Sequence, residues 1–267
     1  IDERILHTGQ HFDPLMSDTF FHQLGIPAPS YQLHCGGTDA SHMTAMALTG
    51  IADAIADYRP HYVLVYGDTT STLAGAIAAS QQHIDLIHVE AGLRSFNRLM
   101  AEETNRILTD HMASLLFCPT QTAVENLHHE GINEGVYHVG DIMYDAARVY
   151  ADTACRHSTL PDTRDIGATP FMLCTLHRAE NIDRADRLRS ILTALNSLAT
   201  TARPIIWPLH PHTRQCITAH ALDNLLTINP ALRIIDPVGY LDMVWLECHA
   251  DLILTDSGGI QKEAYFH

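Results

Sequence analysis

Four short apolar segments of this sequence are each followed by residues that could do chemistry. Asp68 follows YVLVYG, Glu90 follows LIHV, His210 follows PIIWPL, and the DSGG segment at 256–259 begins after LILT. Carboxylates can take and return protons, whereas a Ser-Gly-Gly turn before a helix can present backbone N–H groups to an anion. The pattern is therefore compatible with acid–base chemistry at the first two strand ends and with an anion site at the last.

Each acidic residue of the first half also has a structural interpretation. Asp68 could cap the helix that follows it, and Glu90 could form an ion pair with Arg94 or His88. Glu102 belongs to AEETNR at the start of a predicted helix, where the helix dipole favours acidic residues. Spacing alone leaves both interpretations open.

The second half offers groups suited to a nucleotide. Glu263, one turn into the helix after the Ser-Gly-Gly turn, could reach a ribose hydroxyl pair or could lie on a solvated helix face. His177 and Arg178 end the segment FMLCTLHR and, with His210, would add positive donors to the same cleft. Glycine in such a turn can also be present only because the backbone conformation of the turn requires it.

The elements that must position these residues are short strands alternating with helices. The strands lack a polar–apolar alternation, which predicts parallel, doubly wound sheets in an α/β fold. We expect two Rossmann-like domains, residues 1–158 and 168–267, joined by a linker within 155–169; the first helix is expected over 13–24. Ligands of such sheets bind at the carboxyl ends of strands, so we expect the site in the cleft between the domains.

Composition excludes several classes of function. The 267 residues are 46% hydrophobic, and 16 Lys plus Arg against 31 Asp plus Glu give a net charge of −15, which argues against nucleic acid or an anionic membrane as partner. Neither an apolar run of about 18 to 20 residues nor a leader pattern is present, so we expect a soluble cytoplasmic protein. The six cysteines form no CxxC pair and the 19 histidines show no metal-ligand spacing, which predicts reduced thiols and no metal site.

Six motifs together resemble a known enzyme family. GDTTSTLAGA, HVEAGLRS, EETNR with the TD that follows, HRAEN, PLHPH and LILTDSGGIQKE occur in the order found in non-hydrolysing UDP-N-acetylglucosamine 2-epimerases. The resemblance implies a two-domain fold like that of GT-B glycosyltransferases, a homodimer without metal or redox cofactor, and a role in polysaccharide precursor synthesis.

The resemblance also implies roles for individual residues. Asp68, Glu90 and Glu102 match the family's acid–base carboxylates, without assignment of base or acid, and His210 matches a residue that meets the diphosphate; these four are our catalytic candidates. The residues that match the UDP-holding positions are Arg178, Asn181, Ser257, Gly258, Gly259 and Glu263. The implied reaction eliminates UDP to leave a 2-acetamidoglucal, which accepts UDP again after the proton returns on the other face.

Several departures from the family pattern qualify these expectations. The opening strand with its GTRPE-type loop and the later RDTTERPE-like segment have no counterpart, and Ala101 and Met243 replace a Pro and an aromatic residue. Gln10 and His11 match a segment near a regulatory pocket, but Met46 falls where regulated members carry an Arg.

The sequence is compatible with more than one substrate and more than one reaction. RSFN at 94–97 resembles branches that act on diacetamido uronic acid sugars, so we expect a UDP-2-acetamido sugar whose C3 and C6 substituents stay undecided. A GT-B glycosyltransferase that uses a UDP-sugar is the first alternative, since fold alone does not fix the reaction. A chain that binds a UDP-sugar without turnover is the second.

Overall fold

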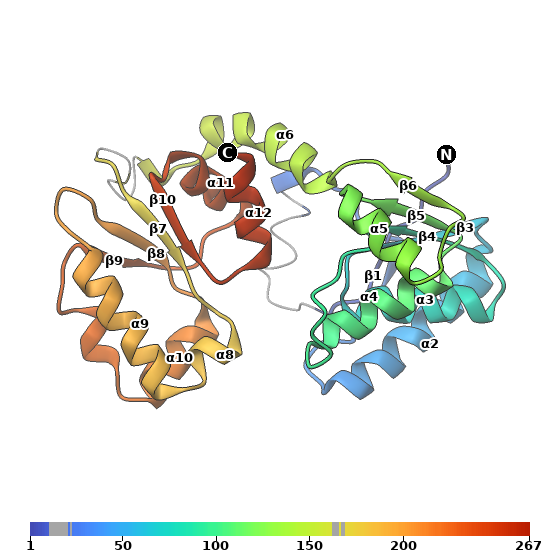
Figure 1. Ribbon diagram of the computed structural model, residues 1–267, viewed down its shortest axis with the longest axis horizontal. Coiled ribbons are helices and arrows are strands. Elements are labelled where there is room, and N and C mark those ends of the chain that lie inside the picture. Colours follow the sequence, from blue (N-terminus) through green and yellow to red (C-terminus); the bar gives the residue numbers. More distant parts are fainter. Residues whose placement is uncertain (11–20, 22, 162–165, 167–168) are drawn as a thin grey trace. The chain divides into compact units, whose positions relative to one another are not determined.

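The computed structural model describes residues 1–10, 21, 23–161, 166 and 169–267. The chain forms two compact units, Ile1–Ile142 and Met143–His267 (Figure 1). His11 and most of the helix expected over 13–24 lie outside the described residues, as does part of the expected linker. No described helix is long and apolar enough to cross a lipid bilayer.

The first unit contains a parallel sheet with the strand order β3-β4-β5-β6. Its strands are β3 Tyr62–Tyr66, β4 Asp85–Val89, β5 Leu115–Cys118 and β6 Val136–His138. Its helices are α2 Ala40–Tyr58, α3 Thr70–Gln81, α4 Ala101–Met112 and α5 Gln121–His129. A further parallel pair consists of β1 Leu6–His7 and β2 Tyr31–Gln32.

Helix α3 is rich in alanine and contains Gly75 where it packs close to the sheet. A Cβ on Gly75 would lie 2.9 Å from Cγ1 of Val65 on β3, so only glycine fits this approach without a shift. The opposite face of β3 carries exposed Tyr62, Leu64 and Tyr66, since successive strand side chains point to opposite faces.

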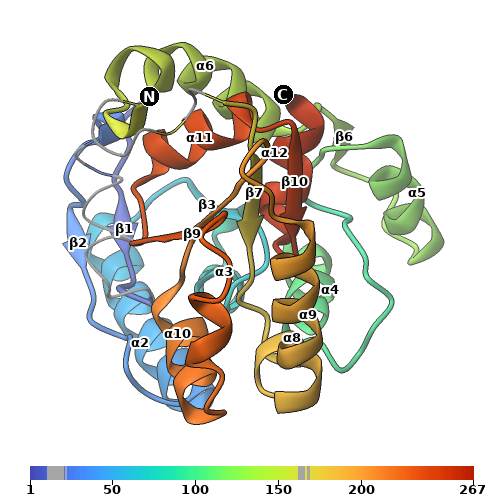
Figure 2. The same ribbon diagram turned by 90° about the vertical axis from the view of Figure 1, so that its left-hand side faces the viewer.

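The second unit has the strand order β10-β7-β8-β9, again fully parallel. Its strands are β7 Met172–Thr175, β8 Ile205–Pro208, β9 Leu232–Ile235 and β10 Leu252–Thr255. Figure 2 shows β7 and β10 side by side although 80 residues of sequence separate the paired Thr175 and Thr255. The strand order reverses between these two strands, and ligands of doubly wound sheets bind at such switch points.

Helices surround the sheet of the second unit, and its strands β7 and β8 are buried throughout, as expected for strands covered on both faces. The helices are α6 Ile142–His157, α8 Ala179–Ile182, α9 Ala185–Leu198, α10 Pro211–Ala219, α11 Tyr240–His249 and α12 Gly258–Phe266, with a 3-10 turn at Asp223–Leu226.

The boundary between the units differs from the expected domain boundary at 158–168. Helix α6, which we expected to close the first domain, packs with the second unit. The ring of Tyr150 on α6 meets that of Tyr240 edge-on at 5.7 Å, and the Ser158 hydroxyl donates to Asp242 at 2.7 Å. These contacts are made between segments distant in sequence, so turn signals alone could not reveal them.

Candidate functional site

Asp68 and Glu90 lie at the carboxyl ends of two neighbouring strands. Tyr66 of β3 is paired with Val89 of β4, and the N–H of Gly67 donates to the Val89 carbonyl at 3.0 Å. Asp68 and Glu90 follow directly, and both are half-buried. The structure thus brings two of the three predicted carboxylates to one edge of the sheet.

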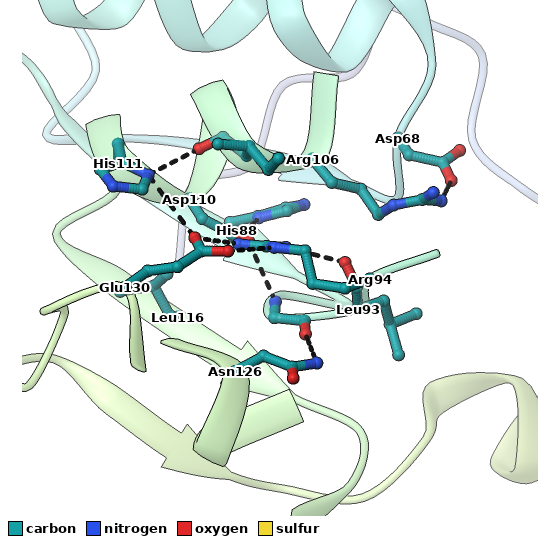
Figure 3. A network of polar contacts seen from close by, with 12 residues as sticks. Asp68, His88, Leu93, Arg94, Arg106, Asp110, His111, Leu116, Asn126 and Glu130 are labelled. Atoms are coloured by element: carbon teal, nitrogen blue, oxygen red, sulfur yellow. Dashed lines mark hydrogen bonds and ion pairs between the residues drawn. The ribbon is translucent and has the colours of Figure 1, made fainter. Parts of the chain in front are cut away.

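Asp68 is held by helix α4. Its Oδ2 accepts a hydrogen bond from Nη1 of Arg106 at 2.5 Å (Figure 3). Its carbonyl accepts one from the side chain of Asn105 at 2.8 Å. The N-cap of α3 is Thr69, whose hydroxyl accepts from the N–H of Thr72. The capping interpretation of Asp68 is therefore wrong, because the next residue does that work.

Glu90 has a left-handed backbone conformation, with φ of 68°. A non-glycine residue pays about 1 kcal/mol or more for this conformation, so the surrounding turn must enforce it. Such strain is concentrated at functional sites, which supports Glu90 as a site residue.

Asp110 of α4, which the sequence analysis did not select, organises the turn after Glu90. His88 Nδ1 contacts its Oδ1 at 2.6 Å, whereas Arg94 and the N–H of Gly92 donate to its Oδ2 at 2.7 and 3.1 Å (Figure 3). Arg94 also binds Glu130 through two bonds of 2.7 Å. His88 and Arg94, the residues we expected to pair with Glu90, thus both bind Asp110.

The two adjacent glutamates of α4 have different environments. Glu102, the predicted candidate, is exposed and precedes Arg106 by four residues, so both lie on one helix face. Glu103 is buried, and its carboxylate accepts from the N–H groups of Ser95 and Phe96, both at 2.8 Å, and from Arg106. Burial alone would raise the pKa of Glu103, but these donors outweigh it and lower that pKa to about 2.

In the second unit Asp256 joins the ends of β10 and β7. Its carboxylate accepts from the backbone N–H groups of His177 and Arg178 and from the side chain of Asn181 at 2.8 Å. The described contact of Asn181 is therefore with Asp256, a residue that we had counted only as part of the DSGG turn. The signal for it was its place directly after LILT.

The Ser-Gly-Gly turn lies beside Arg178. The Ser257 hydroxyl caps α12 by accepting from the N–H of Ile260 at 3.4 Å, and a Cβ on Gly258 would lie 3.6 Å from Nη2 of Arg178. Alanine would meet nothing closer than 3.8 Å at Gly259, and neither glycine has a positive φ. Neither the backbone conformation nor a neighbouring group of the described chain therefore requires glycine at these two positions. A ligand that approaches the turn closely would explain why both residues lack a side chain.

His210 and Glu263 complete the predicted set in this unit. His210 is the N-cap residue of α10, and its ring Nδ1 accepts a hydrogen bond from the N–H of His212 at 3.2 Å. The centre of the His210 ring lies 6.0 Å from that of His177. Glu263 is half-buried and contacts the hydroxyl of Tyr240 at 3.5 Å. Burial raises the pKa of Glu263, so it does not lie on the freely solvated helix face that we considered.

Glu247 of α11 is a buried acidic residue that the sequence analysis missed. Its side chain is nearly inaccessible, and within the described part of the chain neither carboxylate oxygen has a hydrogen-bond partner. Burial, with a smaller contribution from Glu263, raises the pKa of Glu247 to about 9. Its carboxyl group is therefore neutral at pH 7.

The two parallel, doubly wound units define an α/β protein of the Rossmann type. The whole chain, residues 1–267, matches the family model of UDP-N-acetylglucosamine 2-epimerase. It is 50% identical over 272 aligned residues to the UDP-2,3-diacetamido-2,3-dideoxy-D-glucuronate 2-epimerase of Pseudomonas aeruginosa, covering 100% of this chain and 73% of that protein. The chain therefore belongs to the UDP-N-acetylglucosamine 2-epimerase family, as its motifs indicated.

Solved structures agree with this assignment. The crystal structure of the Methanocaldococcus jannaschii UDP-GlcNAc 2-epimerase in complex with UDP-GlcNAc and UDP matches with a TM-score of 0.91 at 41% identity, covering 100% of this chain and 74% of that one. The Neisseria meningitidis UDP-GlcNAc 2-epimerase bound to UDP-GlcNAc gives a TM-score of 0.86 at 30% identity, over 99% and 72% of the chains. The expected GT-B-like fold class is confirmed.

Proposed function

We propose that this chain is a UDP-2-acetamido sugar 2-epimerase, of the type that interconverts UDP-GlcNAc and UDP-ManNAc. The observation that carries the proposal is the match over all 267 residues to the 2-epimerase family, with 50% identity to a 2-epimerase of a related UDP-sugar. The strand-end carboxylates and the Ser-Gly-Gly turn are the groups that this reaction needs.

Proton transfer at C2 is the task we assign to the first unit. A C2 proton is weakly acidic, so we propose that a carboxylate takes it as the C1–O bond breaks and UDP leaves, which gives a 2-acetamidoglucal. A proton then returns to C2 from the opposite face while UDP re-forms the C1–O bond, so the overall reaction is redox-neutral. Asp68, Glu90 and Glu102 are the proposed acid–base residues.

Arg106 supports a specific division of work at this edge. Its guanidinium binds both Asp68 and Glu103, so the charge of Asp68 is partly compensated. Glu90 occupies the strained position directly after β4. We propose Glu90 as the group whose removal costs the most turnover, and Asp68 as a carboxylate positioned by α4.

Stabilisation of the UDP leaving group is the task we assign to the second unit. The guanidinium of Arg178 lies beside Gly258, where it and the N-terminus of α12 would bind a diphosphate. His210 is the proposed further donor, and Glu263 the proposed ribose ligand. For Asn181, its hydrogen bond to Asp256 supports a role in positioning the loop that carries Arg178.

The assay that tests the proposal follows the sugar by proton NMR, with UDP-GlcNAc and UDP-2,3-diacetamido-2,3-dideoxy-D-glucuronate supplied separately. We expect the C2 epimer of at least one substrate without any added acceptor. Transfer of the sugar to an added acceptor, with no epimer, would instead support the glycosyltransferase alternative. UDP binding by calorimetry without either product would identify a binding protein and reject the proposal.

The same resemblance supports proposals about assembly and setting. We propose a homodimer of the cytoplasm that serves polysaccharide precursor synthesis. Sedimentation equilibrium of the protein should give twice the mass of the chain; a monomer that retains full turnover would reject the dimer.

A further inference from the structure

A second cluster of reactive side chains lies outside the proposed site, on the surface between α8 and α10. Oδ1 of Asp183 lies 3.9 Å from Nε2 of His212 and 3.8 Å from Sγ of Cys216, and the last two atoms are 4.0 Å apart. These distances form a nearly equilateral triangle of one oxygen, one nitrogen and one sulfur atom. We propose that this triangle binds a thiophilic divalent transition-metal ion such as Zn²⁺.

The dimensions of the triangle fit tetrahedral coordination. Zn²⁺ bonds of about 2.0–2.3 Å to oxygen, nitrogen and sulfur place the ligand atoms about 3.4–3.6 Å apart. The observed separations of 3.8–4.0 Å exceed these values by about 0.3–0.6 Å, which side-chain rotations can close. Three ligands leave one coordination position for water, because the cluster is exposed to solvent.

The fold holds the three ligands in place. His212 and Cys216 are four residues apart on α10 and therefore project from one face, and α10 is anchored by the buried Thr213 hydroxyl, which donates to the Leu176 carbonyl at 2.6 Å. Asp183 ends α8, and its carbonyl contacts Nε2 of His220 at 3.1 Å, at the other end of α10. The cluster is thus assembled before a metal arrives.

The proposed metal would connect two segments that also carry candidate site residues, namely Asn181 and His210. Asn181 lies on α8, and the His212 N–H is already bonded to the His210 ring. A metal on Asp183, His212 and Cys216 would join the segments that follow β7 and β8. Its binding does not depend on the proposed reaction, in which it takes no chemical part.

Cobalt spectroscopy tests this site, because a thiolate bound to Co²⁺ gives a charge-transfer band in the near ultraviolet and tetrahedral Co²⁺ gives visible d–d bands. We expect both from the chelator-treated protein without a histidine tag, with one equivalent of Co²⁺ per chain and displacement by Zn²⁺. Cys216→Ser should abolish the charge-transfer band. The matched control Cys155→Ser, which changes an exposed cysteine of α6, should retain it.

Two results would overturn the proposal. One is the absence of the thiolate band in the unsubstituted protein, and the other is its full retention in Cys216→Ser. Asp183→Asn provides a test that keeps the thiol: we expect weaker Co²⁺ binding and loss of the thermal stabilisation by Zn²⁺, while the far-ultraviolet circular dichroism confirms folding. Unchanged affinity in Asp183→Asn would contradict the three-ligand site.

Discussion

Glu102 and Glu103 are neighbours in sequence with different surroundings. Glu103 binds the backbone of the loop at 95–96 and the guanidinium of Arg106, whereas Glu102 is exposed at the start of α4. Glu103 is therefore a positioning residue: it fixes the loop and, through Arg106, Asp68. Glu102 is the one of the two that we propose for contact with a substrate.

Glu103→Gln should lower the free energy of unfolding at pH 7 by about 2–3 kcal/mol, because the buried donors lose a charged acceptor. The folded pKa of Glu103, about 2, lies below its ordinary value of 4.5. Its stabilisation is therefore complete above about pH 4.5 and is lost as the pH falls towards 2. Urea unfolding at pH 7 and pH 3 should show a smaller pH dependence in Glu103→Gln.

Glu102→Gln is the matched control for this measurement. It should unfold as the unsubstituted protein does at both pH values. Equal pH dependence in all three proteins would contradict the role assigned to Glu103.

Glu247→Met should stabilise the protein in mildly alkaline solution by about 2 kcal/mol, because it removes a buried carboxyl group without partners. The folded pKa of Glu247, about 9, lies above its ordinary value of 4.5, so the native state retains a proton that the unfolded chain releases. This residue therefore costs stability as the pH rises from 4.5 towards 9. Thermal unfolding at pH 5 and pH 8.5 should show a clearly larger gain at the higher pH; an equal gain at both would argue against a titrating Glu247.

The turns that follow the strands carry the candidate site. Their glycines differ in whether the backbone and its neighbours require a residue without a side chain. Gly92, after β4, has φ of +77°, and a Cβ there would lie 2.3 Å from the Ala123 carbonyl oxygen. Gly258 and Gly259, after β10, meet neither restriction. Gly92 serves the fold, whereas we assign the two glycines of the second unit to the ligand.

Alanine substitutions separate these two uses of glycine. Gly258→Ala and Gly259→Ala should leave the midpoint of thermal unfolding nearly unchanged but weaken UDP binding about tenfold, since a methyl group would obstruct an approaching phosphate. Gly92→Ala should lower the unfolding midpoint by several degrees. Calorimetry with UDP and thermal scans of the same variants test both; unchanged UDP affinity in both variants of the second unit would reject the assignment.

The sequence predicted the elements better than their contacts. Apolar runs and the helices between them sufficed for the parallel sheets, and the rule about strand ends selected Asp68, Glu90, His210 and the DSGG turn. The sequence could not reveal that Asp110 and Asp256 organise these turns, because each binds a distant segment. Asp110 lies 18 residues from its partner Gly92, and Asp256 lies 79 residues from its partner His177. Which of two adjacent glutamates is buried likewise depends on how α4 packs.

At the scale of the whole molecule, the division into compact units falls earlier in the chain than the domain boundary that we expect, which stays a prediction. Turn residues gather at 155–169, whereas α6 packs with the second unit and the units divide between Ile142 and Met143. The expectation of one site built from both domains stays a prediction. Because the net charge of the chain is −15, binding of an anionic UDP-sugar would require a local cation. Arg178, beside Gly258, is the cation that we propose for this role.

Exchange of the C2 hydrogen with solvent tests the central claim most directly. In deuterated water the protein should place deuterium at C2 of the epimerised sugar, and also of recovered substrate, because the proton is removed and returned. Glu90→Gln should reduce both epimerisation and exchange about a hundredfold or more while it remains folded. Epimer formed without deuterium at C2, or full turnover in Glu90→Gln, would contradict the account.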